Sequence, residues 1–92
     1  MHATICLPTY NERENLERMV AALRAVLRDG DRILVIDDGS PDGTGEIADR
    51  LSAEHANVSV LHRTVKEGLG PAYIAGFRHA LADGAELVIE MD

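Results

Sequence analysis

The chain has 92 residues with a hydrophobic fraction of 46% and a charged fraction of 27%, a composition typical of one small globular domain rather than a disordered or fibrous chain. Its formal net charge of −7 argues against a nucleic-acid-binding protein, because such proteins present a basic surface. No apolar run approaches the ~20 residues of a membrane span, the N-terminus lacks a signal-peptide pattern, and the single cysteine, Cys6, excludes an internal disulfide.

The first predicted elements are a strand and a helix. Residues 3–7 form an apolar run that predicts a buried strand ending at Pro8. In the helix that follows, we expect Asn11 to be the N-cap, Glu14 to complete a capping box, and Gly30 to mark the C-terminal end. Its apolar face repeats at helical spacing and comprises Leu16, Met19, Val20, Leu23, Val26 and Leu27.

A second strand and helix follow the same pattern. Residues 33–36 are continuously apolar, which predicts a strand buried on both faces. The segment 37–44 is rich in Asp, Gly, Ser and Pro and predicts a turn. A second helix is expected to run to about His55, and residues 58–61 predict a third, shorter strand nearer an edge of the sheet.

The last predicted elements are a helix and a strand. Residues 68–71 open the helix, because Pro71 suits a first helical turn, and Gly84 ends it. Its expected buried face comprises Tyr73, Gly76, Phe77, Ala80 and Leu81. Residues 87–91 predict a fourth strand, after which the chain ends at Asp92.

The alternation of strands and helices predicts an α/β fold with a parallel, doubly wound sheet, because crossovers between parallel strands are right-handed. The two most apolar strands, 3–7 and 33–36, should be central, so we expect the spatial strand order 3-2-1-4.

Carboxylates follow three of the four predicted strands: Glu12 after the first, Asp37 and Asp38 after the second, and Asp92 after the fourth. Ligands of such sheets bind beyond the carboxyl ends of the strands. Asp37 and Asp38 fit either ordinary turn chemistry or hydrogen bonding to a nucleobase edge, and as successive residues they should point to opposite sides with different roles. Asp92 fits either a solvated strand end or a ligand of Mg²⁺ or Mn²⁺.

Other candidate residues are ambiguous. Gly68 and Gly70 lack the third glycine of a dinucleotide fingerprint and favour a tight loop over a phosphate site. Arg63 and Lys66 fit either phosphate contacts or solvated loop charges. The four histidines show no metal-ligand spacing and are interpreted as structural or solvent-facing: His2, His55, His62 and His79.

Four segments resemble the polyprenol-phosphate (dolichol-phosphate) mannose synthases of glycosyltransferase family 2. Residues 7–16 resemble their opening segment and residues 37–44 their second motif. Residues 68–76 are similar to the third, and Met91-Asp92 matches the start of the segment that holds a metal-binding Asp-x-Asp. The resemblance covers essentially the whole chain and implies that residues 1–92 are the nucleotide-sugar-binding, N-terminal half of a GT-A (Rossmann-like) domain, truncated within the Asp-x-Asp motif.

The resemblance also implies a chemistry. The donor is GDP-mannose, the acceptor is a polyprenyl phosphate, the sugar carbon is inverted, and a divalent cation assists. The residues expected to line the nucleotide-sugar site are Pro8, Tyr10, Glu12, Ile36, Asp38 and Asp92, with Asp92 also the metal ligand. No catalytic base is expected, and activity of the 92 residues alone is doubtful. A cytoplasmic location at a membrane face is implied, with membrane contact through parts not present here.

Three alternatives remain at this stage. A family-2 transferase that uses a UDP-sugar, such as a polyprenyl-phosphate glucosyltransferase, would share the motifs at residues 10–12 and 37–40. A phospho-acceptor receiver domain would explain the acidic end of the strand at residues 32–38. A non-catalytic nucleotide-binding fragment would explain the site without an activity.

Overall fold

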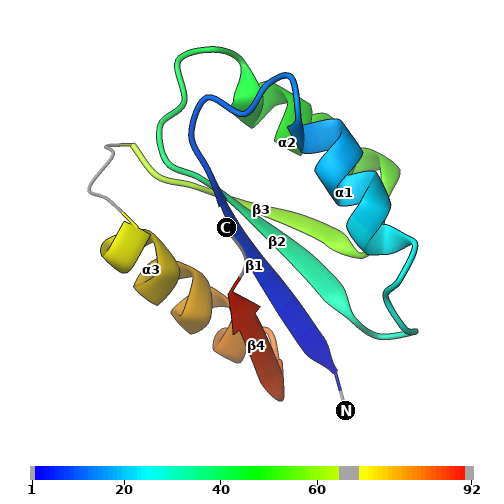
Figure 1. The fold of residues 1–92 in the computed structure, drawn as a ribbon. Coiled ribbons are helices and arrows are strands. Elements are labelled where there is room, and N and C mark those ends of the chain that lie inside the picture. Colours follow the sequence, from blue (N-terminus) through cyan, green and yellow to red (C-terminus); the bar gives the residue numbers. More distant parts are fainter. Residues whose placement is uncertain (1, 65–68, 91–92) are drawn as a thin grey trace.

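The computed structural model describes residues 2–64 and 69–90, and it alternates strands with helices along the chain (Figure 1). The elements are β1 (Ala3–Thr9), α1 (Leu16–Arg24), β2 (Arg32–Asp37), α2 (Thr44–Glu54), β3 (Val58–His62), α3 (Leu69–Ala82) and β4 (Leu87–Glu90). The predicted β-α-β-α-β-α-β order is confirmed, with strand and helix bounds that differ at several ends.

The four strands form one parallel sheet in the order β3-β2-β1-β4, as predicted. Ile5 of β1 lies opposite Ile33 of β2, and Ile33 lies opposite Val58 of β3. The order follows from burial, because β2 carries the longest run of buried residues and takes a central place, whereas β3 is at an edge. The parallel register brings the carboxyl ends of the strands to one edge of the sheet.

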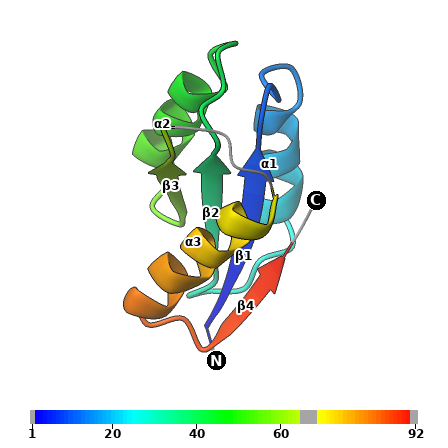
Figure 2. The same cartoon turned by 90° about the vertical axis from the view of Figure 1, so that its left-hand side faces the viewer.

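Helices cover both faces of the sheet, so the doubly wound architecture is confirmed (Figures 1 and 2). Residues of β2 alternate between the faces: Ile33 and Val35 pack with α1 and α2, and Leu34 and Ile36 pack with α3. The larger core joins Leu7, Leu16, Val20, Ile33, Val35, Ala48, Leu51 and Val58. The smaller core joins Cys6, Leu34, Ile36, Ala72 and Ala80.

The predicted N-terminus of the first helix is wrong. α1 begins at Leu16 with Asn15 as its N-cap, and no side-chain capping bond is present there. Asn11 has a left-handed backbone (φ 55°), a conformation that asparagine tolerates better than most residues and that is incompatible with the predicted capping box. The carbonyl of Glu12 accepts the N–H groups of Asn15 and Leu16 instead.

The predicted C-terminus of the same helix is also wrong. α1 ends at Arg24, and Val26, expected on the buried face, is 75% exposed. Gly30 does adopt a left-handed conformation (φ 90°), but in a separate turn before β2. Asp31 stabilises that turn, because its carboxylate accepts the N–H groups of Arg28 and Ala3. These hydrogen bonds hold residues 28–31 in a turn, so the helix does not continue to Gly30.

Helix α3 confirms most of its predicted face. Gly76 and Ala80 are buried, and Gly84 ends the segment with a left-handed backbone (φ 89°). Leu81 was expected to be buried and is 62% exposed. Small residues allow α3 to lie close to the sheet, since a Cβ atom on Gly76 would come within 2.4 Å of Ile36 Cδ1.

Candidate functional site

The candidate site lies where β1 and β2 end side by side. Pro8 is paired with Ile36 and Thr9 with Asp37 in the parallel register, so residues of even number at this edge face the α3 side. The Thr9 hydroxyl donates to the Ile36 carbonyl at 3.3 Å, and the Asp38 N–H donates to the Thr9 carbonyl at 3.1 Å. The two strand ends are therefore joined up to the point where their loops begin.

Asp37 and Asp38 point to opposite sides and have different partners, as the strand alternation predicted. Asp37 Oδ2 lies 3.1 Å from Nδ1 of His62, and Asp38 Oδ1 accepts a hydrogen bond from Nη1 of Arg63 at 3.0 Å. Both aspartates are buried, with 6% and 5% exposure. Burial of two adjacent carboxylates is costly without a hydrogen-bonding partner for each, and these partners are His62, the last residue of β3, and Arg63, the residue after it.

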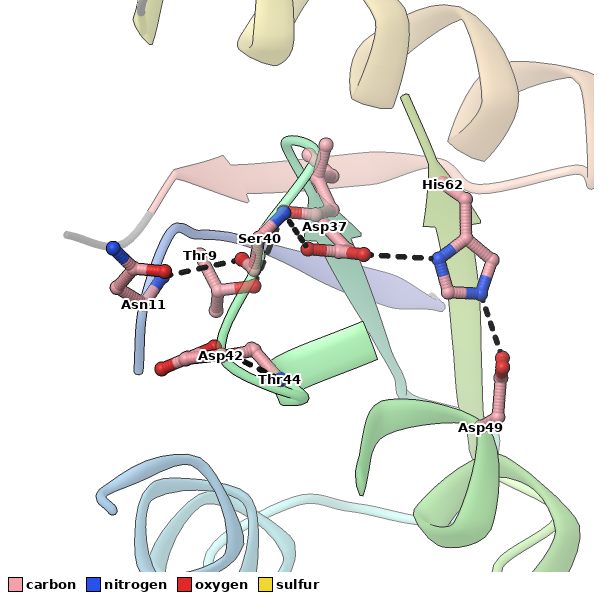
Figure 3. A network of polar contacts seen from close by, with 9 residues as sticks. Thr9, Asn11, Asp37, Ser40, Asp42, Thr44, Asp49 and His62 are labelled. Carbon is pink, nitrogen blue, oxygen red and sulfur yellow. Dashed lines mark hydrogen bonds and ion pairs between the residues drawn. The ribbon is translucent and has the colours of Figure 1, made fainter. Parts of the chain in front are cut away.

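Three hydrogen bonds attach the loop after β1 to residues 40–44, and Figure 3 shows the first of them, between Asn11 and Ser40. In each, a backbone N–H of the first loop donates to a side-chain oxygen: Asn11 to Ser40 Oγ at 3.1 Å, Arg13 to Asp42 Oδ2 at 3.3 Å, and Glu12 to Oγ1 of Thr44, the first residue of α2, at 3.0 Å. Asn11, which donates the first of these bonds, has the left-handed backbone conformation described above. The two loops with the sequence motifs thus form one connected unit.

Asp42 connects this unit to the start of α2. Its Oδ1 accepts the N–H of Thr44 at 3.0 Å and also the Thr44 hydroxyl. The hydrogen bond from the Thr44 side chain is the main reason why the pKa of Asp42 lies below its usual value. Asp42 therefore has a role in holding the loops, which the sequence reading of this segment as a plain turn did not include.

The predicted nucleotide-site residues occupy different depths. Ile36 is fully buried and packs in the core beneath α3, Pro8 is half-buried beside it, and Tyr10 is 38% exposed. Glu12 is half-buried, and its carboxylate accepts a hydrogen bond from Asn15 Nδ2 at 3.3 Å. Pro8, Ile36 and Asp38 lie on one side of the strand ends.

Several predicted residues fall outside the part of the chain that the structure describes. They are Asp92, the expected metal ligand, together with Lys66 and Gly68. Within residues 2–64 and 69–90, no group of three or more His, Cys, Asp or Glu side chains is arranged to hold a metal ion.

His62 is the residue whose place the sequence did not indicate. It lies at the end of β3 between Asp37 and Asp49, with Nε2 2.7 Å from Asp49 Oδ1 (Figure 3). The hydrogen bond to Asp49 is the main cause that raises the pKa of His62 above its ordinary value, and the contact with Asp37 acts in the same direction. The available signal was that Asp37 directly follows the predicted strand 33–36 and His62 directly follows the predicted strand 58–61, and the parallel register pairs these two residues.

The helices were compared with the length and apolar character that a membrane span needs. Among the helices in the described residues, none combines the length and the apolar character needed to cross a bilayer.

Comparison with protein families identifies the chain at family level. The model of glycosyl transferase family 2 matches residues 4–92. The chain belongs to glycosyl transferase family 2. This membership confirms the resemblance of the motifs and removes the receiver-domain alternative, since the match includes the segment before residue 32 that a receiver would leave unexplained.

The chain is similar to curated polyprenyl-phosphate mannosyltransferases. It is 51% identical over 92 residues to the undecaprenyl-phosphate mannosyltransferase of Micrococcus luteus, covering 100% of this chain and 37% of that protein. It is 51% identical over 89 residues to the polyprenol monophosphomannose synthase of Mycolicibacterium smegmatis, covering 96% and 33%. With the dolichol-phosphate mannosyltransferase of Pyrococcus furiosus, the identity is 43% over 84 residues, covering 90% and 24%.

A solved structure has the same fold. It is a mannosyltransferase from Pyrobaculum calidifontis in complex with GDP-Man and Mn²⁺, with a TM-score of 0.75 and 28% sequence identity. The match covers 85% of this chain and 24% of that one. The chain therefore spans about a quarter to just over a third of the length of the relatives it matches.

Proposed function

We propose that this chain is the nucleotide-sugar-binding part of an enzyme that transfers mannose from GDP-mannose to a polyprenyl phosphate. The observation that carries the proposal is the connected pair of loops at the ends of β1 and β2, with buried Asp38 at their base. The names of the three relatives and the GDP-Man in the solved structure support the donor and acceptor. The domain boundary at residues 1–92 is part of this proposal.

Asp38 is the residue that we propose for recognition of the nucleotide. A carboxylate accepts two N–H groups from a guanine edge, and such charge-assisted bonds are stronger than neutral ones. Arg63 bonds Oδ1 of Asp38 and holds the carboxyl group in one orientation, so Oδ2 and the second lone pair of Oδ1 would accept the two N–H groups of the base. Pro8, Tyr10 and Glu12 would contact the nucleotide next to Asp38. Ile36 would pack beneath them in the core.

The proposed reaction is a single displacement at the sugar. A phosphate oxygen of the polyprenyl phosphate forms a bond to the anomeric carbon while the bond from that carbon to the GDP diphosphate breaks, which inverts the configuration. An anionic phosphate is already a nucleophile, so no catalytic base is assigned in this chain. Asp92 has the hard oxygen donors that Mg²⁺ and Mn²⁺ take, and such a cation would neutralise charge on the departing diphosphate.

The location and partners follow from the acceptor. We propose that the complete enzyme works at the cytoplasmic face of a membrane, with lipid contact through parts beyond these residues and no nucleic-acid partner. A UDP-sugar donor is the competing assignment within the family.

The test is equilibrium binding by calorimetry, followed by a transfer assay. We expect the chain to bind GDP-mannose weakly, to prefer GDP over UDP in competition, and to lose affinity when EDTA replaces Mn²⁺. We expect no transfer of radiolabelled mannose to polyprenyl phosphate by these 92 residues alone. A preference for UDP would replace the donor assignment, and transfer by the chain alone would refute the need for further residues.

A further inference from the structure

His62 links three elements at the back of the proposed site. It is the last residue of β3 and lies opposite Asp37 in the register with β2. Nδ1 lies 3.1 Å from Oδ2 of Asp37, and Nε2 lies 2.7 Å from Oδ1 of Asp49 on α2. The side chain of Asp37 is 8% exposed, whereas those of His62 and Asp49 are 46% and 62% exposed.

The geometry determines how many protons the imidazole carries. An ionised carboxylate only accepts hydrogen bonds, and a neutral imidazole has a single N–H. His62 can therefore bond to both carboxylates at once only as the imidazolium. In the described residues, the charged groups that face the ring are Asp37 from β2 and Asp49 from α2, while Arg63, the next residue, bonds Asp38 on the opposite side.

Asp37 connects His62 to the loop after β2. Its Oδ2 contacts His62, and its Oδ1 accepts the N–H of Ser40 at 3.1 Å. The Ser40 hydroxyl in turn accepts the N–H of Asn11 in the loop after β1 (Figure 3). The first turn of α2 packs directly on the pair, because a Cβ atom on Gly45 would lie 2.4 Å from Asp37 Oδ2 and 3.3 Å from His62 Cε1.

We propose that His62 is a positioning residue whose protonated form holds Asp37 and the turn after it in the binding conformation, so that nucleotide-sugar affinity falls as pH rises through the neutral range. This inference rests on the proposed function of the same site. His62 acts through Asp37 and Ser40, on the side of the sheet opposite to Asp38.

The direction with pH follows from the pKa. The folded chain raises the pKa of His62 above the ordinary 6.5, chiefly through the bond to Asp49. The doubly bonded form is therefore intact below that ordinary value and is lost as pH rises through the raised one. By linkage, a ligand that binds the protonated form more tightly must itself raise the pKa of His62 further.

The experiment measures the GDP-mannose dissociation constant by calorimetry from about pH 5.5 to about pH 8.5, the range in which a histidine titrates. GDP-mannose is the probe because its diphosphate is esterified at both ends and does not titrate near neutrality. The variants are His62→Gln, which removes the titrating group, and Asp49→Asn, which weakens the exposed partner. His55→Gln is the matched control, since His55 is a half-buried histidine at the other end of α2.

We expect the wild-type affinity to fall about three- to tenfold across this range, equivalent to a coupling of about half to one pKa unit. His62→Gln should show a flat profile, Asp49→Asn should move the midpoint to lower pH, and His55→Gln should match the wild type. NMR titration of the His62 ring should show a higher pKa with GDP-mannose than without it.

The outcomes separate the inference from the function on which it rests. If the wild type binds but shares its pH profile with His62→Gln, His62 has no such role and the proposed function stands. If GDP-mannose does not bind at any pH, both fail. If His62→Gln does not fold, as circular dichroism would show, the exposed Asp49→Asn variant decides, and an unmoved midpoint overturns the inference.

Discussion

At the residue scale, the site depends on two adjacent aspartates that the sheet separates. Asp37 and Asp38 are neighbours in the chain, yet Asp37 contributes to holding the loop whereas Asp38 bonds Arg63. Strand alternation predicted their divergence, and the carboxyl end of β3 provides His62 and, in the next position, Arg63 as their partners. The motif of two successive acids therefore contains one residue that holds the loop and one that we propose for nucleotide binding.

The first prediction concerns Asp38. Asp38→Asn should weaken GDP-mannose binding by about 1.5–3 kcal/mol, because it removes a charge-assisted hydrogen bond. Asp38→Ala should weaken it at least as much, and both should have a larger effect than Asp42→Ala, whose carboxylate bonds the loop and α2 instead. Calorimetric titration of the three variants checks this, with the exposed Asp29→Ala as control. Equal affinities for the Asp38 and Asp42 variants would contradict the assignment.

The second prediction concerns Gly45. Gly45→Ala should destabilise the chain by about 1–3 kcal/mol, because the added methyl group would overlap Asp37 Oδ2, which is buried and held on both sides. Gly70→Ala is the control, since no atom of the described residues lies within 4 Å of the corresponding methyl group and alanine favours a helix. Urea unfolding gives the comparison. A Gly45→Ala variant as stable as the wild type would show that α2 moves away from the Asp37–His62 pair at little cost.

At the element scale, α2 acts as the anchor of both site loops. Thr44, its first residue, is fully buried, accepts the Glu12 N–H and donates to Asp42. The first loop therefore takes its shape from an element more than 30 residues away, which explains why α1 begins later than a local capping pattern predicted. Helix starts depend on where the backbone N–H groups find partners, and here those partners are distant.

The third prediction tests this anchor. Thr44→Val keeps the shape of the side chain but leaves the Glu12 N–H and the Asp42 carboxylate without their shared partner, which should cost about 1–3 kcal/mol of the free energy of unfolding. GDP-mannose binding should weaken as well, because the first loop loses its attachment. Chemical denaturation and calorimetry check both effects, with the exposed Thr64→Val as control. Unchanged stability would show that the loop is held by its other contacts.

At the scale of the whole molecule, charge is the dominant property. The chain carries a net charge of −7 and is proposed to bind an anionic diphosphate, so long-range electrostatics oppose binding unless a cation or salt intervenes.

The fourth prediction follows from this charge. In EDTA, raising NaCl from about 20 mM to about 300 mM should strengthen GDP-mannose binding by about two- to fivefold, because salt screens the repulsion. The affinity for guanosine, which carries no phosphate, should change little and is the matched control. Calorimetry at both salt concentrations is the measurement. Weaker binding at high salt would mean that local basic groups such as Arg63 outweigh the net charge.

The sequence alone determined the order of elements, the parallel doubly wound sheet and its strand order, because the spacing of apolar residues is a local pattern that reports which faces must be buried. It also determined the family, through motifs that lie within short segments. Only the tertiary structure decided where α1 begins and ends, that Val26 and Leu81 are exposed, and that His62 lies between Asp37 and Asp49. The start of α1 and the place of His62 depend on the docking of α2 and on the register of β2 with β3, which bring together residues 25 to 32 positions apart that no local pattern relates.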